Sequence, residues 1–91
     1  MSEQVKRQLE RKRRELKRLD FAIAHHEEYA GYLVECLKIA VTPRDKERLT
    51  RAIEKIDAKL AREWARRHEV FGQIVTIEGT GRAIQERGKN E

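Results

Sequence analysis

The sequence is poor in the residues that cross-link or interrupt a chain. It contains one cysteine and one proline, and aromatic residues make up 5% of its 91 residues. The single cysteine, Cys36, excludes a disulfide within the chain and a zinc site built from cysteines, and it favours a reducing, cytoplasmic compartment. No run of about eighteen apolar residues is present, so we expect no membrane span. We also expect no secretory signal, because no apolar core follows the basic residues near the start.

Charged residues and helix formers dominate what is present. Charged residues make up 41% of the sequence and hydrophobic residues 38%. This mixture of Lys, Arg, Glu, Ala and Leu is typical of long helices and coiled coils. No alternation of apolar and polar residues indicates a strand. We therefore predict one small, all-α domain.

One short stretch, residues 41–45, separates two helical patterns and holds the only proline. Pro43 cannot continue a helix but suits the first turn of a new one. Thr42 is pushed out of helical dihedrals by the proline and can cap that turn, with Asp45 completing a capping box. Because the break is too short for anything but a tight reversal, we predict an antiparallel hairpin; one long kinked helix is the alternative.

The predicted hairpin spans residues 1–79, with helices over about 2–41 and 43–78. Ser2 is the expected cap of the first helix. Gly79 and Gly81 are expected to end the second helix near Glu78. Residues 80–91 are then a polar C-terminal tail that forms a short turn or is disordered.

Both predicted helices carry an apolar seam with a seven-residue repeat. In the first helix the seam is Val5, Leu9, Leu16, Leu19, Ile23, Ala30, Leu33, Leu37 and Ala40, interrupted by Lys12 and His26. In the second it is Leu49, Ile53, Ile56, Leu60, Val70, Ile74 and Ile77, interrupted by Glu63 and Arg67. Glu63 and Arg67 stand one turn apart and can pair with each other. Antiparallel packing then places Arg67 near Leu19, Glu63 near Ile23 and Trp64 opposite Ala22.

The middle of the first helix is apolar on most of its circumference, beyond what one seam needs. A helix of that kind is usually buried on more than one side. An isolated hairpin is also marginally stable, so we predict a four-helix bundle or a larger helical homo-oligomer. The predicted oligomer interface consists of Phe21, Ile23, His26, Tyr29, Ala30, Leu33, Leu37 and Trp64.

Positive charge is concentrated at the open end of the predicted hairpin. The net charge is +5, and residues 1–20 hold eight Lys or Arg against four acidic residues. Such a cluster binds a phosphate backbone or an acidic protein, or it is only a solvated face. No aromatic residue interleaves the basic run, so base stacking is not indicated. The candidate binding residues are Arg7, Arg11, Arg14, Arg18, Arg62 and Arg66.

No arrangement of residues indicates catalysis, a metal or a cofactor. His25 and His26 are adjacent, so on a helix they point about 100° apart and do not chelate one ion together. We expect His26 to be a satisfied seam histidine and His25 to face solvent. Cys36 lies in an apolar setting, which favours inert packing.

Residues 49–57, followed by Arg66 and Arg67, loosely resemble the first helix of the all-helical chorismate mutases. In that family the helix opens the chain and a further active-site lysine follows. Here the helix comes second and residues 68–81 contain no lysine. We therefore expect that the protein is not an enzyme.

Two functional hypotheses remain. The first is a small non-enzymatic interaction module, an adaptor or inhibitor acting through protein contacts, of the kind that phage or plasmid genomes encode. The second is a nucleic-acid-binding hairpin that uses the basic open end. Its shape and charge are similar to those of Rop-type RNA-binding bundles.

Overall fold

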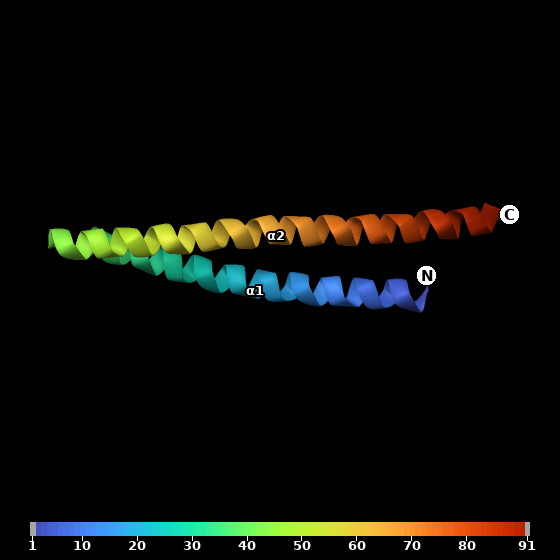
Figure 1. The fold of residues 1–91 in the computed structure, drawn as a ribbon, viewed down its shortest axis with the longest axis horizontal. Helices are drawn as coiled ribbons and strands as arrows, with labels where there is room; N and C mark the ends of the chain where they lie inside the picture. Colours follow the sequence, from blue (N-terminus) through green and yellow to red (C-terminus); the bar gives the residue numbers. More distant parts are fainter. Residues whose placement is uncertain (1, 91) are drawn as a thin grey trace.

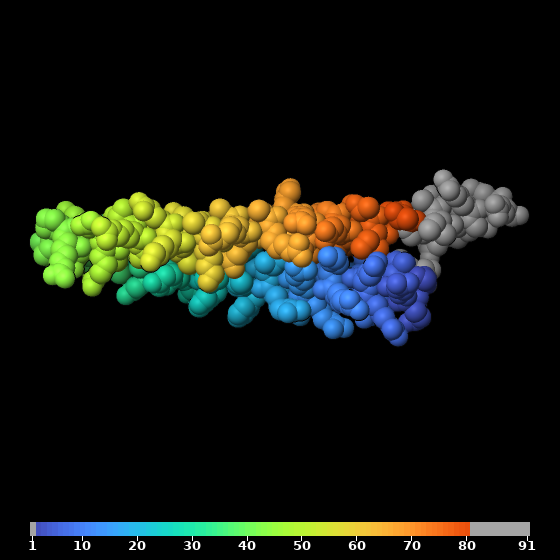
Figure 2. Space-filling model, in the orientation of Figure 1, coloured from blue at the N-terminus to red at the C-terminus, as the bar shows by residue number. Residues whose placement is uncertain are grey.

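The computed structural model describes residues 2–90, with side chains for residues 2–80. It consists of two helices, α1 (Glu3–Ile39) and α2 (Pro43–Asn90), and no strand occurs within residues 2–90. The helices run antiparallel as a hairpin, with overall dimensions of 73 × 17 × 14 Å (Figure 1). The space-filling view shows α1 packed along α2 over their shared length (Figure 2). The predicted all-α hairpin is therefore confirmed, and the single kinked helix is excluded.

The reversal occurs at residues 40–42, where the sequence predicts it. Ala40 leaves the helical region with φ −67° and ψ 134°, and its N–H donates to the Leu37 carbonyl at 3.3 Å. The Thr42 hydroxyl then accepts from the Asp45 N–H at 3.2 Å, and the Thr42 carbonyl accepts from the Lys46 N–H at 3.1 Å. The first turn of α2 is thus capped by the residue that Pro43 forces out of helical dihedrals.

The start of α1 is also capped as predicted. Ser2 has φ −71° and ψ 159°, and its hydroxyl accepts from the Val5 N–H at 3.2 Å. Glu3 in the first turn faces the positive end of the helix dipole. Each helix therefore begins at a residue whose side chain satisfies a free backbone donor.

The core is a single line of apolar side chains between the helices. Its buried members all belong to the predicted seams: Leu9, Ile23, Leu33, Ile56, Val70 and Ile74. Val70 is fully enclosed, and with Leu9 and Ile74 it forms the cluster at the open half of the hairpin. Burial of such side chains contributes about 1.5–3 kcal/mol each, so this line supplies most of the hairpin's stability.

Helix α2 continues past Glu78, where the sequence predicts its end. The helical residues include Gly79 and Thr80, and the Thr80 hydroxyl donates to the Thr76 carbonyl at 2.9 Å. Among the residues described, no glycine has a positive φ, so Gly79 does not form the left-handed cap. A glycine inside a helix costs only about 1 kcal/mol, which neighbouring turns offset. Residues 80–90 continue α2, so the predicted short turn or disordered tail is wrong over them, and Glu91 lies outside the described residues.

Candidate interaction surfaces

The polar interruptions of the two seams pair across the hairpin. His26 Nδ1 lies 2.6 Å from Glu63 Oε1, and the two side chains are 19% and 15% exposed. Arg67 Nε donates to Asp20 Oδ1 on α1. The helical spacing predicts a pair between Glu63 and Arg67. The structure does not contain this pair, because each of the two side chains bonds to a residue of α1 instead. The interpretation of His26 as a satisfied seam histidine is confirmed, and His25 faces solvent as expected.

These pairs also fix the register. Arg67 bonds next to the predicted Leu19, Glu63 bonds one turn beyond the predicted Ile23, and the Trp64 indole reaches Glu27 instead of Ala22. Trp64 and Arg66 reach in opposite directions along α1, to Glu27 and to Glu15, so these long side chains are compatible with the predicted alignment.

Two edges flank the seam, and each carries its own polar contacts. On one edge Trp64 Nε1 donates to Glu27 Oε1 at 3.2 Å. On the other edge Arg66 Nε donates to Glu15 Oε1 at 2.7 Å. Glu15 directly precedes the seam residue Leu16 and Glu27 directly follows the seam residue His26, so the two carboxylates lie on opposite sides of the seam, about 120° apart around the helix. We call the side of the seam with Glu27 the Trp64 edge and the side with Glu15 the Arg66 edge.

The predicted interface residues divide into two groups. Five of them line the seam of a single hairpin, where Ile23 and Leu33 are buried and His26, Ala30 and Leu37 are partly buried. The other three lie outside: Phe21 is 78% exposed, and Tyr29 and Trp64 are each 47% exposed. The structure therefore does not bring the eight residues together on one outer surface.

Six of the nine exposed large apolar side chains in the described part lie in two stripes along the edges, and Phe21, Val34 and Val41 lie outside these stripes. The α1 stripe consists of Tyr29, Tyr32, Cys36 and Ile39, and the α2 stripe consists of Trp64, Phe71 and Val75. Tyr29 lies two seven-residue repeats after Glu15, which places the α1 stripe on the Arg66 edge. The α2 stripe lies on the Trp64 edge. Sequence reasoning missed Val75, although its spacing of four residues from Phe71 is the signal that would have found it.

The α1 stripe is uncharged. The neighbouring Cys36 thiol raises the pKa of the Tyr32 phenol above its ordinary value of 10.0. Tyr29, Tyr32 and Ile39 offer large contact areas there without a charge to desolvate.

The predicted basic residues are not equivalent. Arg7, Arg11, Arg14 and Arg18 are exposed on the side of α1 that faces away from α2, and Arg62 is exposed on α2. Arg66 instead bonds to Glu15 and lies 3.2 Å from Glu69. Its hydrogen bond with Glu15 raises the pKa of Arg66, and the same bond joins α2 to α1.

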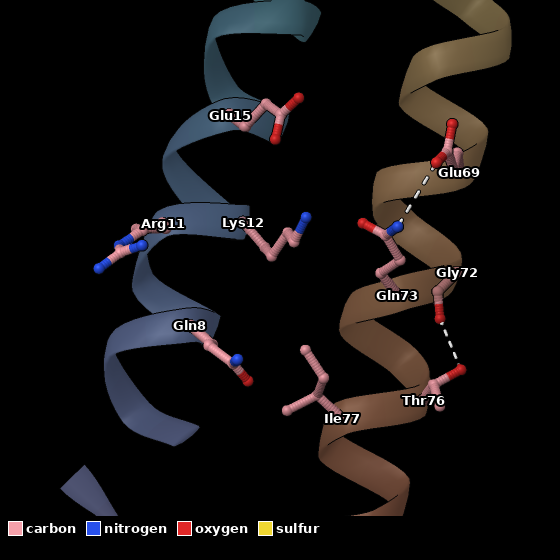
Figure 3. Close-up of a pocket in the computed structure, with 9 residues that line it drawn as sticks. All are labelled: Gln8, Arg11, Lys12, Glu15, Glu69, Gly72, Gln73, Thr76 and Ile77. Carbon is pink, nitrogen blue, oxygen red and sulfur yellow. Dashed lines mark hydrogen bonds between the residues drawn. The ribbon is translucent and has the colours of Figure 1, made fainter. Parts of the chain in front are cut away.

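At the open end, a groove between the helices is lined by polar side chains (Figure 3). Lys12, one of the predicted interruptions of the seam, points into this groove, while Arg11 points away from α2 (Figure 3). Gln73 donates to Glu69 at 3.5 Å, and its own Oε1 is enclosed without a partner. Ile77 is the one large apolar residue among those that line the groove.

Comparisons of this chain with protein-family models, with curated proteins and with solved structures gave no match. Over the residues that the structure describes, neither helix has a stretch long and apolar enough to cross a membrane. Within that same part of the chain, no three His, Cys, Asp or Glu side chains gather in a way that would hold a metal ion.

Proposed function

We propose that the protein is a non-enzymatic interaction module whose hairpin pairs with a second copy through the α1 stripe. The observation that carries this proposal is the exposure of large apolar side chains in the middle of α1. Tyr32 is 65% exposed and Ile39 is 79% exposed. Clustered apolar residues left in water are typical of a protein contact surface.

The proposal follows from how little one hairpin buries. Among residues 2–80, nine large hydrophobic side chains are exposed and six hydrophobic side chains are buried. Two helices cover only one stripe each, and domains of this size usually need a partner or a cross-link to reach useful stability. A second hairpin on the α1 stripe supplies the missing layer of a helical bundle.

Charge favours a second copy as the occupant of the α1 stripe. Residues 21–42 carry one Lys against three Glu, whereas residues 1–20 carry eight Lys or Arg against four acidic residues. Antiparallel packing of two α1 helices about this middle region places the basic halves at opposite ends of the pair. Self-association therefore does not bring two strongly cationic surfaces together.

Cross-linking through Cys36 tests the pairing, because this cysteine is partly exposed within the stripe. We expect a short bis-maleimide reagent to give a covalent dimer, and the combined change Tyr32→Glu and Ile39→Glu to abolish it. Both side chains are exposed in the single hairpin, so circular dichroism should still detect a helical protein, with a lower unfolding temperature because the second hairpin no longer stabilises it. The matched control is Val75→Glu on the opposite edge, which should leave the yield unchanged. A yield that survives the double change, or that Val75→Glu removes, would refute pairing through the α1 stripe.

A further inference from the structure

We propose that the outer face of α1 binds single-stranded nucleic acid, with Phe21 as a base-stacking residue and the neighbouring arginines on the phosphates. The site is a line of five side chains at alternating spacings of four and three residues. It runs through Arg7, Arg11, Arg14, Arg18 and Phe21, and we call it the basic stripe. That spacing keeps all five on one helix face, over about 21 Å.

The packing of the hairpin leaves this stripe with little neutralisation. The carboxylates of the same half of α1 that lie near α2 are held by arginines of α2: Glu15 by Arg66 and Asp20 by Arg67. The only ion pair found in the stripe joins Arg14 to Glu10 at 3.6 Å, with both side chains more than 60% exposed, in the part of the chain whose side chains are described. Exposed pairs of that kind are weak, so the stripe keeps its positive charge.

Phe21 supplies an exposed aromatic ring beside the arginines, which the sequence alone did not indicate. It is 78% exposed and lines a shallow open hollow together with Arg14, Lys17 and Arg18. A second open hollow shares Arg14 and Arg18 and adds Arg11 and Glu15, the carboxylate that Arg66 binds, together with Leu19 and Ala22. An aromatic face next to several cations is the combination that single-strand-binding proteins use, since bases stack on the ring while cations follow the backbone.

The composition of the stripe favours nucleic acid over an acidic protein. Protein interfaces usually bury an apolar centre, whereas the stripe offers one apolar side chain, Phe21. Protein–nucleic-acid interfaces are more polar and more positively charged. Four of the five cations in and beside the stripe are arginines, whose planar guanidinium groups match phosphate oxygens in pairs.

Fluorescence anisotropy with a labelled oligothymidylate of about twenty nucleotides tests the proposal on the full chain. We expect binding at low salt, with a slope of log affinity against log salt of roughly −3, because each phosphate contact contributes about −0.7. Changing both Arg11 and Arg18 to Gln should reduce the slope by about 1.4. Phe21→Ala should weaken binding by about ten-fold or more at constant slope.

Two control variants and a competitor distinguish this site from other exposed aromatic or arginine residues and from a site for an acidic protein. Phe71→Ala removes an exposed phenylalanine from α2, and Arg51→Gln removes an arginine that bonds to Glu47 at 2.6 Å near the turn. Neither should change the affinity. The proposal is overturned by lack of binding at low salt. Competition by polyglutamate as strong as that by the oligonucleotide would overturn it too, because it indicates an acidic-protein site.

The inference does not depend on the proposed pairing of two hairpins. Phe21→Ala should leave the Cys36 cross-linking yield unchanged, since Phe21 lies outside the α1 stripe. If Phe21→Ala instead abolishes the covalent dimer, Phe21 belongs to the self-association surface and its assignment to nucleic acid is wrong.

Discussion

At the scale of single residues, the seam is held in register by the pairing of His26 with Glu63. If the helices slid by one turn, Leu60 or Arg67 would replace the carboxylate opposite His26, and the imidazole would lose this partner. A polar pair in an apolar seam often selects one alignment at some cost in stability. The 2.6 Å contact between Nδ1 and Oε1, with both side chains mostly covered, fits that role.

The first prediction concerns this pair. Glu63→Ala should lower the free energy of unfolding by about 1–3 kcal/mol, because it leaves the partly buried imidazole without its partner. The double change His26→Leu with Glu63→Leu should recover most of that loss, since an apolar pair needs no hydrogen bond there. Urea unfolding followed by circular dichroism, at one protein concentration, measures both. A double variant no more stable than Glu63→Ala would show that the pair does not act as a unit.

At the scale of helices, the two capping residues decide where each helix begins. Both hydroxyls accept from the backbone N–H three residues later at 3.2 Å. Ser2 and Thr42 therefore both cap a helix. Thr42 also lies at the reversal of the chain, because Pro43 follows it. Thr42 and Pro43 therefore act together at the reversal.

The second prediction follows from the Thr42 cap. Thr42→Ala should reduce the free energy of unfolding by about 0.5–2 kcal/mol, because the Asp45 N–H loses its acceptor. Thr42→Ser retains the hydroxyl and should stay close to the original stability. Thermal unfolding of the three proteins gives the comparison. If the serine variant is as unstable as the alanine variant, the threonine methyl group and not the cap stabilises the turn.

The positions of the helices could be predicted from the sequence more reliably than the contacts between them. The reversal, both caps and every buried side chain follow from local rules that act within a few residues. The partners of Glu63 and Arg67 do not follow from such rules. Each side chain can bond either to a neighbour on its own helix or to a residue of α1, and the alignment of the two helices decides between them. The continuation through Gly79 was also missed, since a glycine stops a helix only when the chain adopts a left-handed turn there.

The exposed surfaces were the least predictable part. Apolar residues were recognised in the middle of α1, but a pattern on one helix does not say which edge of a hairpin it will occupy. The sequence groups Phe21, Tyr29 and Trp64 in one interface, and the structure leaves them on separate sides. The commitment of Arg66 to Glu15 likewise depends on an interhelical contact that one helix's spacing does not reveal.

At the scale of the whole molecule, the hairpin is a thin rod with more exposed than buried large apolar side chains in its described part. Its basic stripe lies on the first half of α1, and its uncharged stripe lies on the second half. This separation allows one helix to carry two surfaces of different chemistry. The proposed pairing uses the half near the turn and leaves the open ends, with their arginines, free for another partner.

Sedimentation equilibrium of the unmodified protein over a wide concentration range tests the central claim most directly. If the α1 stripe pairs two hairpins, the weight-average mass should rise with concentration to twice the chain mass of 10.8 kDa or above. Tyr32→Glu with Ile39→Glu should return it to the mass of one chain. A mass of 10.8 kDa for the unmodified protein at every concentration would contradict the account.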